Sequence, residues 1–175
     1  ENKLKKSEKE ILEDLKQAIN QAIDDGYTTF ITGMAYCVDI WAGELVLKKR
    51  FWNRNIKLIA AIPFAGFESR WNDRWKDRYH KLLNKADEVH YICDGYSKYA
   101  YQKRNEWMVD RSTRVIAVYN GEPSGTGNTI NYAKKAGVPA VYIQAWIGDG
   151  CMCTRFYVEP DTEEIREIIA EVQRS

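Results

Sequence analysis

The sequence has 175 residues, of which 45% are hydrophobic and 29% are charged, and its formal net charge is +1. This length is typical of one domain with a substantial core. The near balance of acidic and basic residues argues against binding to nucleic acid or a membrane through overall charge. No apolar run is long enough to span a bilayer, and the N-terminus shows no signal peptide. We therefore expect a cytoplasmic protein.

The four cysteines are too few for a disulfide framework in a chain of this size. Cys151 and Cys153 are separated by a single residue, whereas the cysteine pairs of zinc sites usually have at least two residues between them. The sequence therefore predicts neither a metal site nor a bound cofactor, with a redox or metal role for this pair as the alternative.

The predicted elements alternate between helices and strands. The first helix begins with Ser7 and Glu10 at capping-box spacing and ends before Gly26. The predicted helices are Ser7 to Asp25, Val38 to Lys49, Ser69 to Ala86, Tyr99 to Ser112 and Thr129 to Lys135. The predicted strands are Tyr27 to Thr32, Ile56 to Phe64, Asp87 to Cys93, Val115 to Tyr119 and Val138 to Gln144. This alternation predicts an α/β fold, a Rossmann-like three-layer sandwich whose mainly parallel sheet is flanked by helices.

The tail is less regular. It is predicted to contain an extra strand from Met152 to Val158 and a last helix from Thr162 to Gln173. No internal repeat or low-complexity linker divides the chain. We therefore expect a single domain over residues 1–175, with a core over 1–144 and a C-terminal extension of a strand and a helix over 145–175.

Two strand-to-helix loops have the composition of a ligand site, because ligands of open α/β sheets bind at the carboxyl ends of the strands. The first loop offers Gly33, Met34, Ala35 and Asp39, with little side chain to block approach to the backbone. The second loop, after an apolar strand, offers Ser124, Gly125, Thr126, Gly127, Asn128 and Thr129. Small residues and a helix N-terminus suit a phosphate group. The alternatives are a plain turn and a surface loop.

Arg104 and Asn105 lie between these loops on a predicted helix, and the pair is suited to holding a phosphate or a ribose. A solvated charged face is the alternative interpretation. Trp71, Trp75 and Tyr79 recur every fourth residue beside several basic residues. They form either an aromatic platform for nucleic acid or, as we prefer, a face that packs on the core or on another subunit.

Together these segments resemble the YpsA-like branch of the SLOG superfamily, which also includes the LOG and DprA proteins. The similarity runs in order from about Ile11 to Ile143. The matching stretches are Gly26 to Ala35, Val38-Asp39 with Glu44, Lys57 to Phe64, Lys103 to Asn105, Met108 to Ser112, Ile116 to Tyr119, Gly125-Thr126 and Thr129-Ile130. The resemblance implies a Rossmann-like domain that binds nucleotides or nucleotide-derived ligands at these loops.

LOG-type relatives cleave the base from a nucleoside monophosphate with an arginine and a glutamate. Arg104 matches that arginine, but the segment from Thr129 to Tyr132, where the glutamate is expected, has no carboxylate. Without it, no group is assigned to assist departure of the base, which favours a binding protein over an enzyme. Asp39 and Glu44 are the substitute carboxylates of the alternative hypothesis, a LOG-like nucleotide N-glycosidase.

The chain departs from the family pattern in two further places. Members of this branch usually begin with a strand that ends in Gly-His-Arg-Pro, and this sequence starts after that point. Either that segment is missing here, or the tail segment from Met152 to Val158 does something different with the sheet. Cys37 stands where the family usually has glycine, so its side chain is expected to narrow the first loop.

The leading hypothesis is a homo-oligomeric protein that senses or sequesters a nucleotide-derived small molecule. The bacterial and phage occurrence of the family makes phage–host or stress signalling its expected setting. DprA-like binding of single-stranded DNA is a further alternative, and the balanced charge argues against it.

Overall fold

The computed structural model describes residues 6–144 and 155–160. The helices are α1 (Glu8–Asp24), α2 (Val38–Trp52), α3 (Asp73–Leu83), α4 (Ala100–Asp110) and α5 (Gly125–Lys135). The strands are β1 (Tyr27–Thr32), β2 (Lys57–Ile62), β3 (Glu88–Tyr91), β4 (Arg114–Tyr119), β5 (Ala140–Gln144) and β6 (Arg155–Pro160). Among these helices, none combines the length and the apolar character that crossing a membrane requires.

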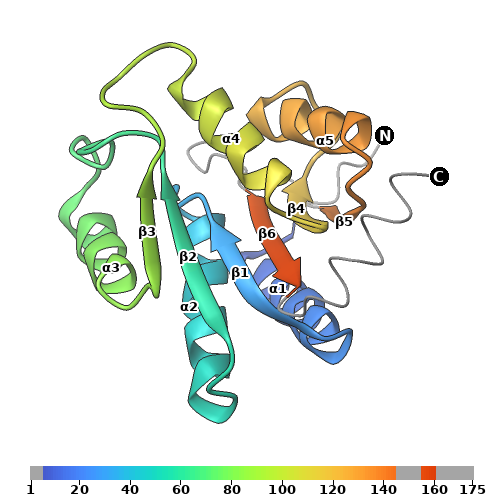
Figure 1. Cartoon of the computed structure of the whole chain (residues 1–175). Coiled ribbons are helices and arrows are strands. Elements are labelled where there is room, and N and C mark those ends of the chain that lie inside the picture. The colour runs from blue at the N-terminus through green and yellow to red at the C-terminus, as the bar shows by residue number, and fades with distance from the viewer. Residues whose placement is uncertain (1–5, 145–154, 161–175) are drawn as a thin grey trace.

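The strands form one six-stranded sheet in the order β3-β2-β1-β6-β4-β5 (Figure 1). β1, β2 and β3 are parallel to one another, as are β4 and β5. β6 lies between β1 and β4 and is antiparallel to both. The other five strands therefore point the same way, and the predicted α/β, Rossmann-like fold with a mainly parallel sheet is confirmed.

The extra strand predicted in the tail is present, but its position was not anticipated. The described strand covers Arg155–Pro160 and pairs with the middle of the sheet on both sides, Val158 opposite Phe30 and Phe156 opposite Ile116. Residues 152–154 and the helix predicted over 162–173 lie outside the described residues. β6 thus supplies the centre of the sheet rather than an added edge.

Helices cover both faces of the sheet. On one face, α1, α2 and α3 pack against alternate residues of β1 and β2, including Phe30, Leu58 and Ala60, in a continuous apolar core. On the other face, α4 and α5 pack against the intervening residues, including Ile31 and Ile59. This strict alternation follows from the two-residue period of a strand buried on both sides. The three layers are those expected from the sequence.

Local capping explains where several helices begin. Ser7 and Glu10 form the expected capping box at α1. α3 begins at Asp73 rather than at Ser69, because the Asn72 side chain accepts a hydrogen bond from the backbone N–H of Trp75 and caps the helix there. α5 begins before the expected Thr129, since Ser124 is its N-cap. The residues expected to form the second loop are therefore largely the first turn of a helix.

The aromatic residues at helical spacing serve packing. Tyr79 is buried and Trp71 and Trp75 are half-buried against the core. The Tyr36 ring contacts both tryptophans, with centroid distances of 5.7 Å to Trp71 and 5.2 Å to Trp75. Burial raises the pKa of the Tyr79 hydroxyl far above its usual value. The preferred packing interpretation, with the rings on the core of this chain, matches these contacts.

Candidate functional site

The carboxyl ends of β1 and β4 mark the point where the chain changes direction within the sheet (Figure 1). From β1 the chain adds β2 and β3 on one side, and from β4 it adds β5 on the other. In open α/β sheets, the crevice at such a switch point is where ligands bind. Both candidate loops start at this edge, and α4 is the helix that crosses from one half of the sheet to the other.

The β1–α2 loop is a tight, internally bonded turn. The Thr32 hydroxyl donates to the Asp39 carbonyl (3.1 Å) and accepts from the Met34 N–H (3.2 Å), while the Ala35 N–H donates to Asp39 Oδ2 (3.1 Å). Met34 and Cys37 have φ angles of 59° and 70°, in the region that favours glycine. The positive φ angle at Cys37 thus explains why a glycine is usual at this position in the family that the sequence resembles. Strain of this kind is concentrated at functional sites.

Arg104 reaches this loop from α4. Its guanidinium Nη1 donates to the carbonyl of Gly33 (2.5 Å), and its Nε donates to Asn105 Oδ1 (3.2 Å). Only 4% of Arg104 and 1% of Asp39 is exposed. A methyl group at Gly33 would stand 2.7 Å from Asp39 Oδ2 and 3.1 Å from Arg104 Cζ. The fold therefore brings a buried carboxylate and a buried guanidinium together over a position that only glycine can occupy without displacement.

The β4–α5 segment forms the second wall. Ser124 Oγ accepts from the Gly127 N–H (3.2 Å), and the Thr129 hydroxyl donates to the Gly125 carbonyl (3.2 Å). A methyl group at Gly127 would stand 3.0 Å from the Tyr119 hydroxyl. The two hydroxyls and the Gly127 N–H bond within the turn, so what this turn offers a ligand is chiefly the positive end of the α5 helix dipole. The sequence analysis did not identify Tyr119 as a residue of the candidate site, because the apolar pattern of its strand indicates only burial.

Of the remaining candidates, Glu44 is placed apart from this group. Both of its carboxylate oxygens accept hydrogen bonds from Arg78 of α3, Oε1 from Nε at 2.9 Å and Oε2 from Nη2 at 2.6 Å. These bonds raise the pKa of the Arg78 guanidinium. No local sequence pattern predicts this pairing, since the partners are 34 residues apart along the chain. Asn128 is exposed at the surface of the α5 turn, while Thr126 is buried beneath it.

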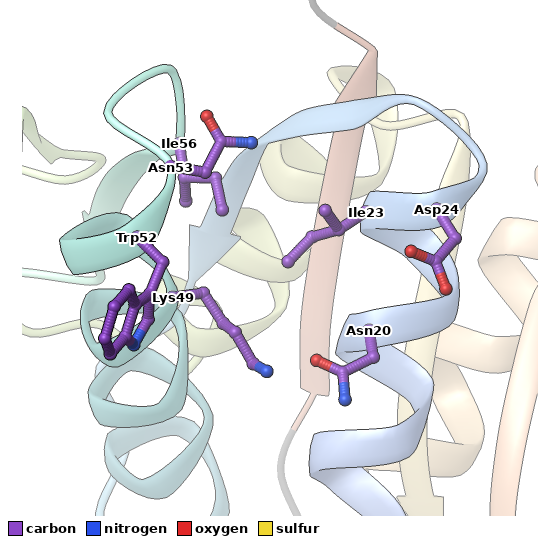
Figure 2. A pocket seen from close by; sticks show the side chains of 7 residues that line it. All are labelled: Asn20, Ile23, Asp24, Lys49, Trp52, Asn53 and Ile56. Carbon is purple, nitrogen blue, oxygen red and sulfur yellow. The ribbon is translucent and has the colours of Figure 1, made fainter.

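Two hollows of similar size lie at opposite edges of the sheet. The first, about 360 Å³, lies at the carboxyl edge and is lined by the aromatic residues Phe64, Tyr96 and Tyr101. The second, also about 360 Å³, lies where α1 and α2 end, with Ile23, Lys49 and Trp52 among the residues around it (Figure 2). Sequence reasoning singled out neither. Within residues 6–144 and 155–160, no three His, Cys, Asp or Glu side chains gather as metal ligands would.

Comparison with known proteins identifies a family for this chain. A family model described as the YspA SLOG family matches residues 2–142. The chain is 39% identical over 121 residues to the uncharacterized SPbeta prophage-derived protein YoqJ of Bacillus subtilis, an alignment that covers 61% of this chain and 69% of that protein. It is 28% identical over 117 residues to a UPF0398 protein of Halalkalibacterium halodurans, covering 63% of this chain and 60% of the relative.

A UPF0398 protein of Staphylococcus haemolyticus is 25% identical over 115 residues, covering 64% of this chain and 61% of that protein. The chain thus spans about 60% of the length of these two UPF0398 relatives. The matched region includes both loops and the arginine of α4. The chain belongs to the YspA SLOG family.

Proposed function

We propose that this protein binds a nucleotide or nucleotide-derived ligand at the carboxyl edge between β1 and β4, as a sensor or sequestering protein. The observation that carries the proposal is the buried arrangement of Asp39 and Arg104 around Gly33 at the switch point of the sheet. Family membership suggests a nucleotide-related function. Buried charged groups held against a strained loop are characteristic of binding sites rather than of structural cores.

Within this proposal, the first turn of α5 and Arg104 share the phosphate. The N–H groups at the start of a helix point outward with the positive end of its dipole, which favours an anion. A guanidinium carries several N–H donors in one plane, so it can hold the Gly33 carbonyl and a phosphate oxygen at the same time. The hydrogen bond to the Gly33 carbonyl then holds the Arg104 guanidinium in its binding position before the ligand arrives.

Binding without turnover is the form of the function that we favour. The segment Thr129 to Tyr132 has no carboxylate, and Glu44 is bonded to Arg78. Asp39 remains near Arg104, but its Oδ2 accepts the Ala35 N–H that shapes the loop. Chromatography of nucleoside monophosphates incubated with the protein tests this directly. Release of free base that is lost in Asp39→Asn and kept in Glu44→Gln would establish the glycosidase alternative instead.

Thermal unfolding with AMP, GMP, ADP, cyclic AMP and ADP-ribose tests the binding itself. A ligand present at 100 times its Kd stabilises the native state by about 2.7 kcal/mol. Gly127→Ala places a methyl group against the Tyr119 hydroxyl at 3.0 Å and should reduce the thermal shift. Gly95→Ala is the matched control, because a methyl group there meets open space. Wild-type protein that shows no shift with any of these nucleotides would contradict the proposal.

The proposal includes a homo-oligomer. Phe51 and Trp52 at the end of α2 are 69% and 85% exposed, and their rings contact each other at 5.1 Å. Exposed apolar patches of this kind mark protein contacts. Light scattering coupled to size exclusion should give a mass above that of one chain, and Trp52→Ser should shift it toward the monomer. A monomeric wild-type protein would remove this part of the proposal.

A further inference from the structure

We propose that the aromatic hollow at the carboxyl edge is the subsite for the base of the bound nucleotide. The aromatic hollow is defined by Phe64, Gly66, Phe67, Ser69, Arg70, Tyr96 and Tyr101. The inference rests on the proposed function, because it assigns the other end of the same ligand. Apart from Phe64, the residues of the hollow lie outside the two loops and outside the stretches that carry the family resemblance.

The lining comes from three segments that meet beyond the ends of β2 and β3. Phe64, Ser69 and Arg70 follow β2, Tyr96 follows β3, and Tyr101 belongs to the first turn of α4. The hollow holds about 360 Å³, within the range of small-molecule sites, which begins at about 300 Å³. The size and the mainly aromatic walls suit one flat heterocycle rather than an extended chain.

The aromatic rings are arranged so that surface stays available for stacking. Phe64 contacts Tyr96 and Tyr101 edge to face, with centroid distances of 5.6 Å and 5.8 Å and interplanar angles of 83° and 79°. Tyr96 is 75% exposed and Tyr101 is 39% exposed. In an edge-to-face pair, at least one ring keeps a face for a third planar group. Exposed rings gathered around one hollow are a surface on which a planar group can stack.

The hollow is connected to the Arg104 site through a single side chain. The Arg104 guanidinium lies 5.9 Å from the centroid of the Tyr101 ring, and Tyr101 is also a wall of the hollow. A base stacked in the hollow and a phosphate at Arg104 would therefore lie on either side of Tyr101. This is the arrangement of a mononucleotide, in which one ribose separates the base from its 5′-phosphate.

The charge of the hollow fits the same ligand. Arg70 is exposed at the lining, and a guanidinium either stacks on a base or attracts the phosphate of an incoming nucleotide. The seven lining residues include no carboxylate. The Ser69 hydroxyl and the turn at Gly66, whose φ is 78°, add polar groups beside the aromatic walls. An anionic ligand with one aromatic ring matches this combination of surfaces.

Calorimetric titration of the full chain with AMP, ADP-ribose and ribose 5-phosphate tests the subsite. Tyr96 is the residue to change, because it is largely exposed and its truncation to alanine should disturb the fold little. Loss of one stacking ring should weaken AMP and ADP-ribose about 5- to 10-fold, at the lower end of the effects of alanine substitution at stacking sites. Ribose 5-phosphate, which has no base, should bind equally to both proteins. Tyr96→Phe keeps the ring and should bind as the wild type does.

Tyr142→Ala is the matched control. Tyr142 is 48% exposed and lies on β5, the outermost strand on the side of the sheet opposite to β3. The subsite is overturned if Tyr96→Ala leaves AMP and ADP-ribose unchanged, or weakens ribose 5-phosphate by the same factor. In either case the wild-type protein still binds these probes, so the proposed function survives. If the wild type binds none of the three probes, the subsite falls together with the proposed function.

Discussion

The amino edge and the carboxyl edge of the sheet differ in how their charged side chains are buried and bonded. At the amino edge, charged side chains pair with one another near solvent. Asp87 Oδ2 accepts from Arg50 Nη1 (2.7 Å) and from the Leu58 N–H (2.8 Å), and Asp25 Oδ2 accepts from Arg114 Nη1 (2.7 Å). At the carboxyl edge, charged groups are buried and bond to the backbone of a strained loop. Exposed pairs contribute little to stability, whereas buried ones fix geometry.

This difference indicates that the two edges have different roles. At the amino edge, partly exposed ion pairs connect the ends of strands and helices, and each contributes little to stability. The carboxyl edge holds a conformation that the sequence would not adopt alone, because Met34 and Cys37 occupy left-handed backbone conformations. A fold maintains such a loop only where the surrounding contacts over-determine it. Substitutions at the carboxyl edge should therefore change ligand binding, whereas substitutions at the amino edge should change stability alone.

Arg104→Ala should have the largest effect. It removes a hydrogen bond from a charged donor to the buried Gly33 carbonyl, which should lower the free energy of unfolding by about 1.5–3 kcal/mol. Binding of AMP should weaken at least about tenfold, since that corresponds to only 1.4 kcal/mol. Urea denaturation and calorimetry measure the two quantities. Arg111→Ala at the exposed end of α4 is the control and should leave binding unchanged.

Gly33→Ala should disturb the same site without removing a charge. The added methyl group would meet Asp39 Oδ2 at 2.7 Å, and overpacking of this kind costs about 1–3 kcal/mol. We expect a lower thermal midpoint and weaker binding of AMP, compared with Gly95→Ala. Unchanged stability and binding would show that Asp39 and Arg104 can move apart freely, which would break the contrast between the edges.

Asp87→Asn should affect stability alone. It weakens the bond from Arg50 at the amino edge, where the two side chains are 26% and 36% exposed. The expected loss is about 0.5–1 kcal/mol, as for other partly exposed ion pairs. The smaller effect of Asp77→Asn, which breaks the more exposed pair with Lys81, provides the reference. A loss of AMP binding in Asp87→Asn would show that the amino edge is not independent of the site.

Asp25→Asn should have the smallest effect, visible as a pH dependence. Hydrogen bonds from Arg114 and then Gln21 hold the pKa of the Asp25 carboxyl below its usual value. A carboxyl whose folded pKa is lowered stabilises the native state above the unfolded pKa of about 3.9 and loses that contribution as the pH falls further. The difference in thermal midpoint between wild type and variant should therefore be present at pH 7 and shrink below pH 4. Asp24→Asn, which removes a neighbouring exposed carboxylate, is the reference for the loss of one negative charge.

The sequence was sufficient for the elements whose signals are local. Gly26 ended α1 and Ser7 began it as predicted, because capping depends on neighbours a few residues away. The place of β6 could not be predicted, since a strand pattern does not name its partners. Likewise, the residue types around the site were recognisable, but the meeting of Asp39 and Arg104 over Gly33 required the fold. The Glu44–Arg78 pair was missed for the same reason.

The central position of β6 has a consequence for how the protein is made. β1 and β4 have no strand contact with each other except through β6, which is the last strand along the described chain. Pairings between distant segments close large loops and slow folding. During synthesis, the β3-β2-β1 half and the β4-β5 half can each form, but their edges stay open until residue 160 has left the ribosome. The nascent chain is therefore expected to depend on chaperones for longer than a sheet assembled strand by strand.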